Sequence, residues 1–322
     1  GGRKSLVGIA RGVAEKSARA VQRYAHEQLF EDSRQAAISS LLGGGPAVGA
    51  LGGASLSGRT ITSRLLTLWL GTWNNNGKVC SEEVLGGWLC GARDAAAAPL
   101  TAAPDVYALG FQEFVPLDAQ NLLRDDAGRR RECVARIEAA LSRIHGEGYV
   151  TVAAEQLVGV LLVVLVRPEL VDEVTHLHAD TVKTGFGYGD GVARAGNKGG
   201  AAIRLGLCGA ELCIINAHLP AGQSHADERN ECHHEILSSL KSSFAKARGG
   251  PFCAPLDHDL CVWLGDLNYR LEAPNDAVRA AIARGHHCDL LDKDQLNLAK
   301  RARTAFSSFE EAEICFPPSY KY

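Results

Sequence analysis

Clusters of polar residues that could bind a cation or a phosphate follow several apolar runs of the sequence. Five segments contain carboxylates, carboxamides, a lysine or a histidine, four of them together with glycine: residues 71–77 (GTWNNNG), 110–113 (GFQE), 196–200 (GNKGG), 216–219 (NAHL) and 263–270 (WLGDLNYR). Carboxylates suit a hard divalent cation, a lysine binds phosphate as a point charge, and a histidine can donate a hydrogen bond or a proton. Together they indicate metal-assisted hydrolysis of a phosphoester.

Each segment taken alone has a simpler explanation. An asparagine after a strand is usually a turn residue, Glu113 could be a solvated strand end, and residues 266–268 read as an Asx turn. Only the joint occurrence favours a site. A zinc site is less favoured, because His233-His234 and His286-His287-Cys288 lack the spaced ligand pairs of structural zinc sites.

Short β-type runs alternate with helical runs from residue 65 onward. The predicted strands are Leu65–Trp73, Val106–Phe111, Tyr149–Ala153, Val158–Val166, Ala201–Leu207, Leu212–Ala217 and Leu260–Leu264. The predicted helices are Ser81–Leu89, Arg129–Ile144, Asp227–Ala247 and Pro274–Arg284. Several connections are too short for repeated βαβ crossovers, so we expect mixed sheets with helices outside and the polar clusters at the strand ends.

Composition narrows the class of protein. The chain has 322 residues, of which 46% are hydrophobic and 22% charged, as in a soluble protein with one large domain and an appendage. The net charge of -3 gives no basic surplus, so nucleic acid is not an expected partner. The ten cysteines form no CxxC pair, which favours reduced thiols and a cytoplasmic location. The most apolar stretch, 157–166, is half the roughly 20 residues of a membrane span, so any membrane contact should be peripheral.

The sequence divides into three parts. Residues 1–42 read as helices, 43–64 as a linker rich in Gly, Ala and Ser, and 65–322 as the main domain. Because the chain contains no methionine, we expect it to be an internal fragment of a longer protein.

The main domain resembles the inositol polyphosphate 5-phosphatases. GTWNNNG, ALGFQEFVPLDAQNLL, GNKGGAAIRL, NAHLPAGQSHADERN, VWLGDLNYRLE and FEEAEICFPPSYKY are similar to that family's successive motifs, in order. The family lies in the endonuclease/exonuclease/phosphatase superfamily, which implies an α/β (α+β) four-layer sandwich of two mixed sheets flanked by helices. The resemblance also implies that the carboxy-terminal strands, with a final Asp-His pair, are missing here, so we expect catalysis by this chain alone to be impaired.

The resemblance assigns roles to five residues around the reacting phosphate. Glu113 would be the main ligand of a magnesium ion, and Asn74 would lie at both the metal and the phosphate. Asp266 would polarise the attacking water, Asn268 would orient the water or the phosphate, and His218 would hydrogen-bond that phosphate.

Substrate contacts and supporting residues follow from the same resemblance. Asn197 and Lys198 would contact substrate, and Tyr320 and Lys321 would bind the neighbouring 4-phosphate. The matching pair Arg229-Asn230 would support the site from behind. The expected reaction is magnesium-dependent removal of the 5-phosphate from a phosphoinositide such as phosphatidylinositol 4,5-bisphosphate, or from a soluble inositol polyphosphate, peripherally at membranes.

Two residues depart from the family motifs. Asn75 replaces an apolar residue of the family motif, and Ala217 replaces a serine before the motif histidine.

Residues 17–44 are similar to the tail of the Sac phosphatase domain in synaptojanin-like proteins. Two alternatives stay open: a catalytically inactive, truncated interaction module, and a nuclease of the same superfamily.

Overall fold

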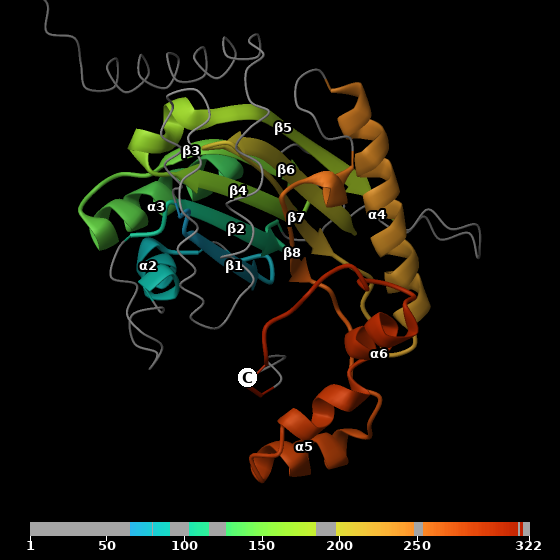
Figure 1. Cartoon of the computed structure of the whole chain (residues 1–322). Helices are drawn as coiled ribbons and strands as arrows, with labels where there is room; N and C mark the ends of the chain where they lie inside the picture. The colour runs from blue at the N-terminus through green and yellow to red at the C-terminus, as the bar shows by residue number, and fades with distance from the viewer. Residues whose placement is uncertain are drawn as a thin grey trace, which may run out of the picture.

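Two four-stranded β-sheets form the centre of the molecule (Figure 1). The computed structural model describes residues 65–78, 80–90, 103–115, 127–184, 198–247, 254–314 and 316–317. The first sheet has the order β1 (Leu68–Asn74), β2 (Val106–Gln112), β4 (Val160–Val166) and β3 (Val150–Leu157). The second has the order β5 (Val174–Lys183), β6 (Gly199–Leu207), β7 (Ala210–His218) and β8 (Leu260–Asp266). Each contains one parallel pair, β1 with β2 and β7 with β8, so both sheets are mixed as predicted.

The strand β4 illustrates why the sheets form where they do. Its sequence VLLVVLV is buried along its whole length. One face packs against helices through Leu161, Val163 and Leu165, and the other packs against the second sheet through Leu162, Val164 and Val166. A continuous run of β-branched and leucine residues is typical of a strand covered on both faces.

Helices cover the outer face of each sheet and complete four layers (Figure 1). On the first sheet lie α2 (Glu82–Cys90) and α3 (Ala127–His145), and on the second lies α4 (Ala226–Lys246). Their buried residues recur at helical spacing, as Ile236, Leu240 and Phe244 do along α4. Burial of each such side chain contributes roughly 1.5–3 kcal/mol, so this stripe docks α4 on its sheet.

The connections between the parallel strands bring the polar ends of the strands to one edge. β1 is connected to β2 through α2, and β7 to β8 through α4, so both strands of each pair end on the same side. After β8 come α5 (Asn275–Ala283), the 3-10 helix η6 (Cys288–Lys293) and α6 (Gln295–Ala302). Two further 3-10 helices are η4 (Pro168–Glu173) and η5 (Pro255–Asp257).

Every strand and helix predicted within the described ranges is present, with shifted ends, but β5 and α6 were not predicted. β5 carries His176, His178 and Asp180, and its register shifts near His176, which has a φ of 49°. This irregularity removes the alternation that identifies a strand. The predicted helices of 1–42 and the linker of 43–64 lie outside the described residues. None of the helices in the described ranges is long and apolar enough to cross a bilayer.

Candidate active site

The carboxyl ends of four strands, two from each sheet, meet at one edge of the sandwich. In register, Asn74 of β1 pairs with Gln112 of β2, and His218 of β7 pairs with Asp266 of β8. Across the gap between the sheets, Asn74 Nδ2 donates a hydrogen bond to Asp266 Oδ2 at 3.0 Å. Residues separated by 192 positions in sequence therefore share one site.

Two carboxylates flank the Asn74 side chain. Its Nδ2 also donates to Glu113 Oε1 at 3.3 Å, and its Oδ1 accepts from the backbone N–H of Asn76 at 3.0 Å. Glu113 follows β2 directly and has a φ of 47°, a left-handed conformation that turns the chain out of the sheet. The site therefore concentrates oxygen ligands and negative charge at the strand ends.

This set of side chains fits a hard divalent cation. Glu113, Asp266 and the Asn74 carboxamide offer oxygen ligands, which Mg²⁺ and Ca²⁺ prefer. Within the described ranges, no three His, Cys, Asp or Glu side chains form a group that could hold a metal ion. A Mg²⁺ ion is usually held by only one or two carboxylates and keeps several waters, so the smaller carboxylate set is sufficient.

Lys198 and its neighbour His218 lie on the other side of the site. Lys198 Nζ donates to His218 Nε2 at 2.5 Å, and His218 Nε2 lies 3.5 Å from Asp266 Oδ2. Burial and the neighbouring Lys198 charge lower the pKa of His218 to about 4, although Asp266 opposes the shift. Burial also lowers the pKa of Lys198 to about 8, against the opposing effect of Asp266 and Glu113. At neutral pH, His218 is therefore neutral and accepts from a lysine that is mostly charged.

Asn268 is held at both ends of its carboxamide. Its Nδ2 donates to the carbonyl of Leu219 at 3.0 Å, and its Oδ1 accepts from Arg270 Nη2 at 2.8 Å. The backbone N–H of Asn268 donates to Asp266 Oδ1 at 3.2 Å, within a turn where Asn268 has a φ of 58°. The turn thus fixes the orientation of the Asp266 carboxylate.

A second group of hydrogen bonds supports these loops from behind. Arg229, fully buried on α4, donates through Nη1 to the carbonyls of Pro220 and Gly222, and through Nη2 to Gln295 Oε1 at 2.6 Å. Gln295 Oε1 also accepts from the backbone N–H of Arg270 at 2.9 Å. The loop after β7 and the segment after β8 are therefore tied to α4 and α6.

The structure brings together most of the side chains that the sequence predicts. Asn74, Glu113, Lys198, His218, Asp266 and Asn268 are connected through the contacts given above. Asn197, Tyr320 and Lys321 lie outside the described residues. Sequence reasoning did not single out Arg270, although it ends the WLGDLNYR segment, and it had no signal for Gln295, which begins an unpredicted helix.

A cavity of about 300 Å³ opens beside Asp266 and Asn268. Arg270, which donates to Asn268, also lines it, together with Tyr269, His287 and Asp294. Its apolar lining consists of Leu271, Leu290, Leu291, Ile314, Phe316 and Pro317. The cavity next to the candidate site is therefore lined by both polar and apolar side chains.

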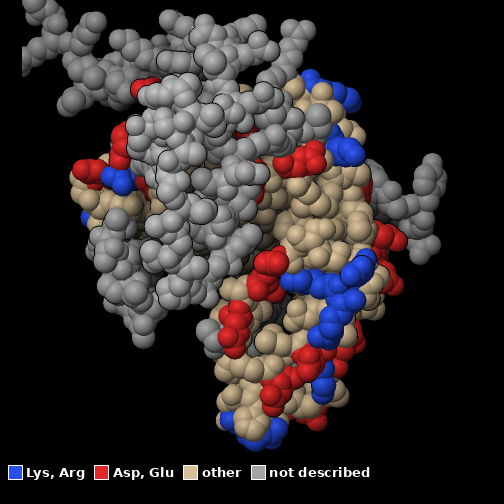
Figure 2. All heavy atoms as spheres, in the orientation of Figure 1, with Lys and Arg blue, Asp and Glu red and all other residues tan. Residues whose placement is uncertain are grey.

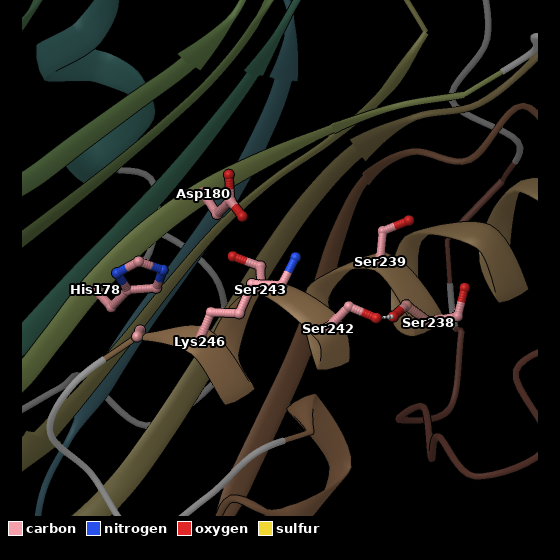
Figure 3. Close-up of a pocket in the computed structure, with 8 residues that line it drawn as sticks. His178, Asp180, Ser238, Ser239, Ser242, Ser243 and Lys246 are labelled. Atoms are coloured by element: carbon pink, nitrogen blue, oxygen red, sulfur yellow. Dashed lines mark hydrogen bonds between the residues drawn. The ribbon is translucent and has the colours of Figure 1, made fainter.

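A larger groove, of about 630 Å³, lies between β5 and the carboxyl-terminal half of α4 (Figure 3). It is lined by His178, Asp180, Ser238, Ser239, Ser242, Ser243, Lys246 and Ala247. The hydroxyls of Ser238 and Ser242 each donate at 3.1 Å to a carbonyl of their own helix. Since the groove includes none of the sequence-predicted site residues, we assign the candidate active site to the strand ends.

Acidic and basic side chains are mixed on the surface around α5 and α6. Figure 2 shows acidic and basic side chains mixed over the part of the molecule that carries α5 and α6. In this view the described residues present no uniformly basic face of the kind that tracks a nucleic-acid backbone.

Known proteins share both the sequence motifs and the fold. Residues 71–322 match the model of endonuclease/exonuclease/phosphatase family 2. The chain is 33% identical to synaptojanin-2 of Homo sapiens over its whole length, which is 23% of that protein. Over 80% of its length it is 34% identical to type I inositol polyphosphate 5-phosphatase 8 of Arabidopsis thaliana, covering 58% of that protein. The chain thus spans less than two thirds of each relative.

A solved structure supports the same grouping. The inositol polyphosphate 5-phosphatase domain of SpSynaptojanin, in complex with inositol (1,4)-bisphosphate and a calcium ion, is 31% identical and superposes with a TM-score of 0.67. The match covers 80% of this chain and 68% of that one. The chain therefore belongs to endonuclease/exonuclease/phosphatase family 2, within which inositol polyphosphate 5-phosphatases are its homologues.

Proposed function

We propose that the protein removes the 5-phosphate from phosphatidylinositol 4,5-bisphosphate with Mg²⁺ as its cofactor. The observation that carries this proposal is the convergence of Asn74 and Glu113, from one sheet, on Asp266, from the other. The relatives named as inositol polyphosphate 5-phosphatases support it. So does the ligand of the SpSynaptojanin domain, because inositol (1,4)-bisphosphate is what remains when inositol 1,4,5-trisphosphate loses its 5-phosphate.

Glu113 and Asn74 would hold the cation. When bound, Mg²⁺ supplies Lewis-acid stabilisation for the phosphoryl oxygens. The calcium ion in the SpSynaptojanin complex supports a hard divalent cation in this fold. Glu113 and Asp266 face the cations Lys198 and Arg270, so a bound Mg²⁺ would leave the site with a positive charge that suits a phosphate.

Asp266 would activate the attacking water. Its carboxylate is oriented by the Asn268 N–H on Oδ1 and by Asn74 on Oδ2, so it can accept a proton from a water placed in line with the scissile bond. The water oxygen forms a bond to phosphorus as the bond from phosphorus to the inositol 5-oxygen breaks, and that oxygen takes a proton from solvent and leaves as a hydroxyl.

Lys198 would supply the positive charge for the phosphate. His218 is neutral at physiological pH and accepts from Lys198, so it keeps the ammonium group directed into the site. A preoriented cation stabilises charge on the phosphoryl oxygens without reorganisation. The carried-over contacts of Asn197, Tyr320 and Lys321 would complete substrate binding.

The same proposal places the protein in the cytoplasm, peripherally at membranes. A lipid substrate requires the site to face a bilayer surface, whereas a soluble inositol polyphosphate does not. We propose that the lipid is the preferred substrate, and that the apolar walls of the 300 Å³ cavity favour it.

Phosphate release tests the function directly. The protein would be incubated with vesicles containing phosphatidylinositol 4,5-bisphosphate, with inositol 1,4,5-trisphosphate and with DNA, each with Mg²⁺ or with a chelator. We expect Mg²⁺-dependent release from both inositides, fastest from the vesicles, and release that is at least about a hundredfold slower from an Asp266→Asn variant. Cleavage of DNA alone would instead support a nuclease, and no hydrolysis of any substrate would support an interaction module.

A further inference from the structure

Two buried carboxamides join the two sheets directly beneath the candidate site. Gln112 ends β2 and is 1% exposed, and Asn216 lies near the end of β7 and is 0% exposed. Gln112 Nε2 donates to Asn216 Oδ1 at 2.6 Å and to Thr72 Oγ1 at 3.1 Å. The hydrogen bond between the carboxamides thus crosses from the first sheet to the second.

Asn216 also contacts a second strand of the opposite sheet. Its Nδ2 donates to the carbonyl of Phe111 on β2 at 3.1 Å and to the carbonyl of Leu161 on β4 at 2.9 Å. Both amide hydrogens and the oxygen of Asn216 are therefore used between the sheets. We call Thr72, Gln112 and Asn216 the sheet bridge.

Gly110 makes room for the bridge. A Cβ atom at this position would lie 2.6 Å from Asn216 Oδ1 and 2.1 Å from Leu264 Cδ1. Both distances are too short for a real contact, so the sheets approach this closely only because residue 110 has no side chain.

The bridge lies one or two residues from the proposed catalytic groups on both sides. Gln112 immediately precedes Glu113 and pairs in register with Asn74. Asn216 lies two positions before His218, which pairs in register with Asp266. Because two residues of a strand span only about 6–7 Å, the length of the bridge constrains the separation between the first-sheet and second-sheet groups.

A contribution to the stability of the fold does not by itself explain these buried hydrogen bonds. Replacing both partners of a buried hydrogen bond by apolar groups of similar shape is often nearly neutral for stability. A fully satisfied polar network instead specifies one arrangement of the elements it joins.

We propose that the sheet bridge is a positioning device for catalysis, which holds Asn74 and Glu113 at the working distance from His218 and Asp266. This inference rests on the proposed function. The side chains of the bridge do not touch the reacting atoms. They act through the side chains that follow them on each strand.

The test compares two ends of the same strand. Thr72→Val removes one hydroxyl of the bridge, whereas Thr67→Val removes a hydroxyl that bonds Asp105 Oδ2 at 3.0 Å before β1, far from the site. Asn216→Leu and the double variant Gln112→Leu/Asn216→Leu remove one or both carboxamides. For each protein, the melting temperature, kcat and KM on inositol 1,4,5-trisphosphate, and Mg²⁺ affinity by calorimetry would be measured.

We expect kcat to fall roughly tenfold in Thr72→Val and roughly a hundredfold in Asn216→Leu, with KM changed less than about twofold, because displaced catalytic groups lose rate more than binding. Mg²⁺ affinity should fall in parallel. The double variant should regain much of the melting temperature of Asn216→Leu but remain slow. Thr67→Val should lower the melting temperature without changing kcat or Mg²⁺ affinity.

A bridge that serves only stability would give a different pattern. Wild-type kcat and Mg²⁺ affinity in Thr72→Val and in the double variant would overturn the proposal while leaving the proposed function intact. If Asn216→Leu fails to fold, the kcat and the Mg²⁺ affinity of Thr72→Val decide between the two explanations. If the unmodified protein hydrolyses no inositide, the proposed function fails, and the Mg²⁺ titrations alone then decide whether the bridge positions the site.

Discussion

At the scale of single residues, the two carboxylates of the site have different surroundings. Asp266 is fixed through both oxygens, by the Asn268 N–H and by Asn74. Glu113 receives a longer bond, 3.3 Å from Asn74, and stands on a left-handed residue outside the sheet. A fixed carboxylate suits the orientation of water, whereas a less constrained one can adjust to a cation.

Because Glu113 and Asp266 have different proposed roles, their substitution should affect different kinetic parameters. Glu113→Gln should raise the Mg²⁺ concentration needed for half-maximal phosphate release, with a smaller effect on the rate at saturating Mg²⁺. Asp266→Asn should lower kcat about 10²–10⁴-fold, the usual contribution of a general base, with little change in the Mg²⁺ requirement. Mg²⁺ titrations of the reaction rate measure both, with Glu83→Gln on the exposed face of α2 as the charge-matched control. Near-normal rates in both variants at every Mg²⁺ concentration would remove these assignments.

His233 is a buried imidazole without a function in the proposed chemistry. It is 5% exposed, its ring centroid lies 4.1 Å from that of Phe306, and neither ring nitrogen has a hydrogen-bond partner among the described residues. Burial, with a smaller effect of His234, lowers its pKa from 6.5 to about 4. The unfolded chain therefore binds the proton more tightly, and protonation favours unfolding.

This pKa predicts acid sensitivity with a definite sign. The free energy of unfolding should decrease as pH falls below 6.5 and level off below about 4, a change on the order of 3 kcal/mol from this residue. His233→Phe should reduce the loss of stability between pH 7 and pH 5, measured by urea unfolding at each pH. The exposed His286→Phe is the control. An identical pH dependence in His233→Phe and the unmodified protein would contradict the prediction.

At the scale of elements, α6 stabilises the site although it contributes no catalytic group. Gln295, at its first turn, is 4% exposed and connects Arg229 of α4 to the backbone of Arg270. It also donates to the carbonyl of Gln223 at 2.9 Å, in the loop after β7. The Gln295 side chain therefore joins α4 and α6 to the loop after β7 and to the segment after β8.

Removing that side chain should loosen both loops together. Gln295→Met should lower the free energy of unfolding by about 1–3 kcal/mol, because a buried arginine loses a partner. Hydrogen exchange should increase in residues 219–223 and 267–271. Asn297→Leu, on the same helix, removes a bond to the carbonyl of Leu291 at 3.1 Å and should leave these loops unchanged. Equal protection of both loops in the two variants would argue against this role.

The elements also mark the limit of sequence reasoning. β4 was predictable because its run of apolar residues is buried on both faces, and the site residues were predictable because they lie at the ends of such strands. β5 was not, because polar residues and a register shift break its pattern. α6 is short and begins with the buried polar Gln295, so its inward face looks solvated in sequence. The distance between the sheets has no sequence signal beyond the glycine at 110.

At the scale of the whole molecule, the site exists only when both sheets are packed together. Asn74 and Asp266 lie on different sheets, and the shared core contains residues of both, such as Val164 and Ile203. A change that separates the sheets should therefore affect stability and chemistry together. Substitution of Gly110 by alanine, which adds one methyl group between the sheets, tests this coupling.

Gly110→Ala should destabilise the fold by about 1–3 kcal/mol, the usual cost of overpacking a core. The added methyl group would meet Leu264 Cδ1, which can rotate away, and Asn216 Oδ1, which is held by the sheet bridge and cannot move without breaking it. The sheets must then move apart at the site, so Mg²⁺-dependent phosphate release should fall as well.

Gly86→Ala provides the matched control for this substitution. Gly86 lies within α2, where an added Cβ meets nothing within 4 Å, so alanine should stabilise the helix by about 0.5–1 kcal/mol without a change in rate. Denaturant unfolding and phosphate release would be measured for both variants. If Gly110→Ala were as stable and as active as Gly86→Ala, the close approach of the sheets at residue 110 would have no part in forming the site, because the molecule could then widen there without cost.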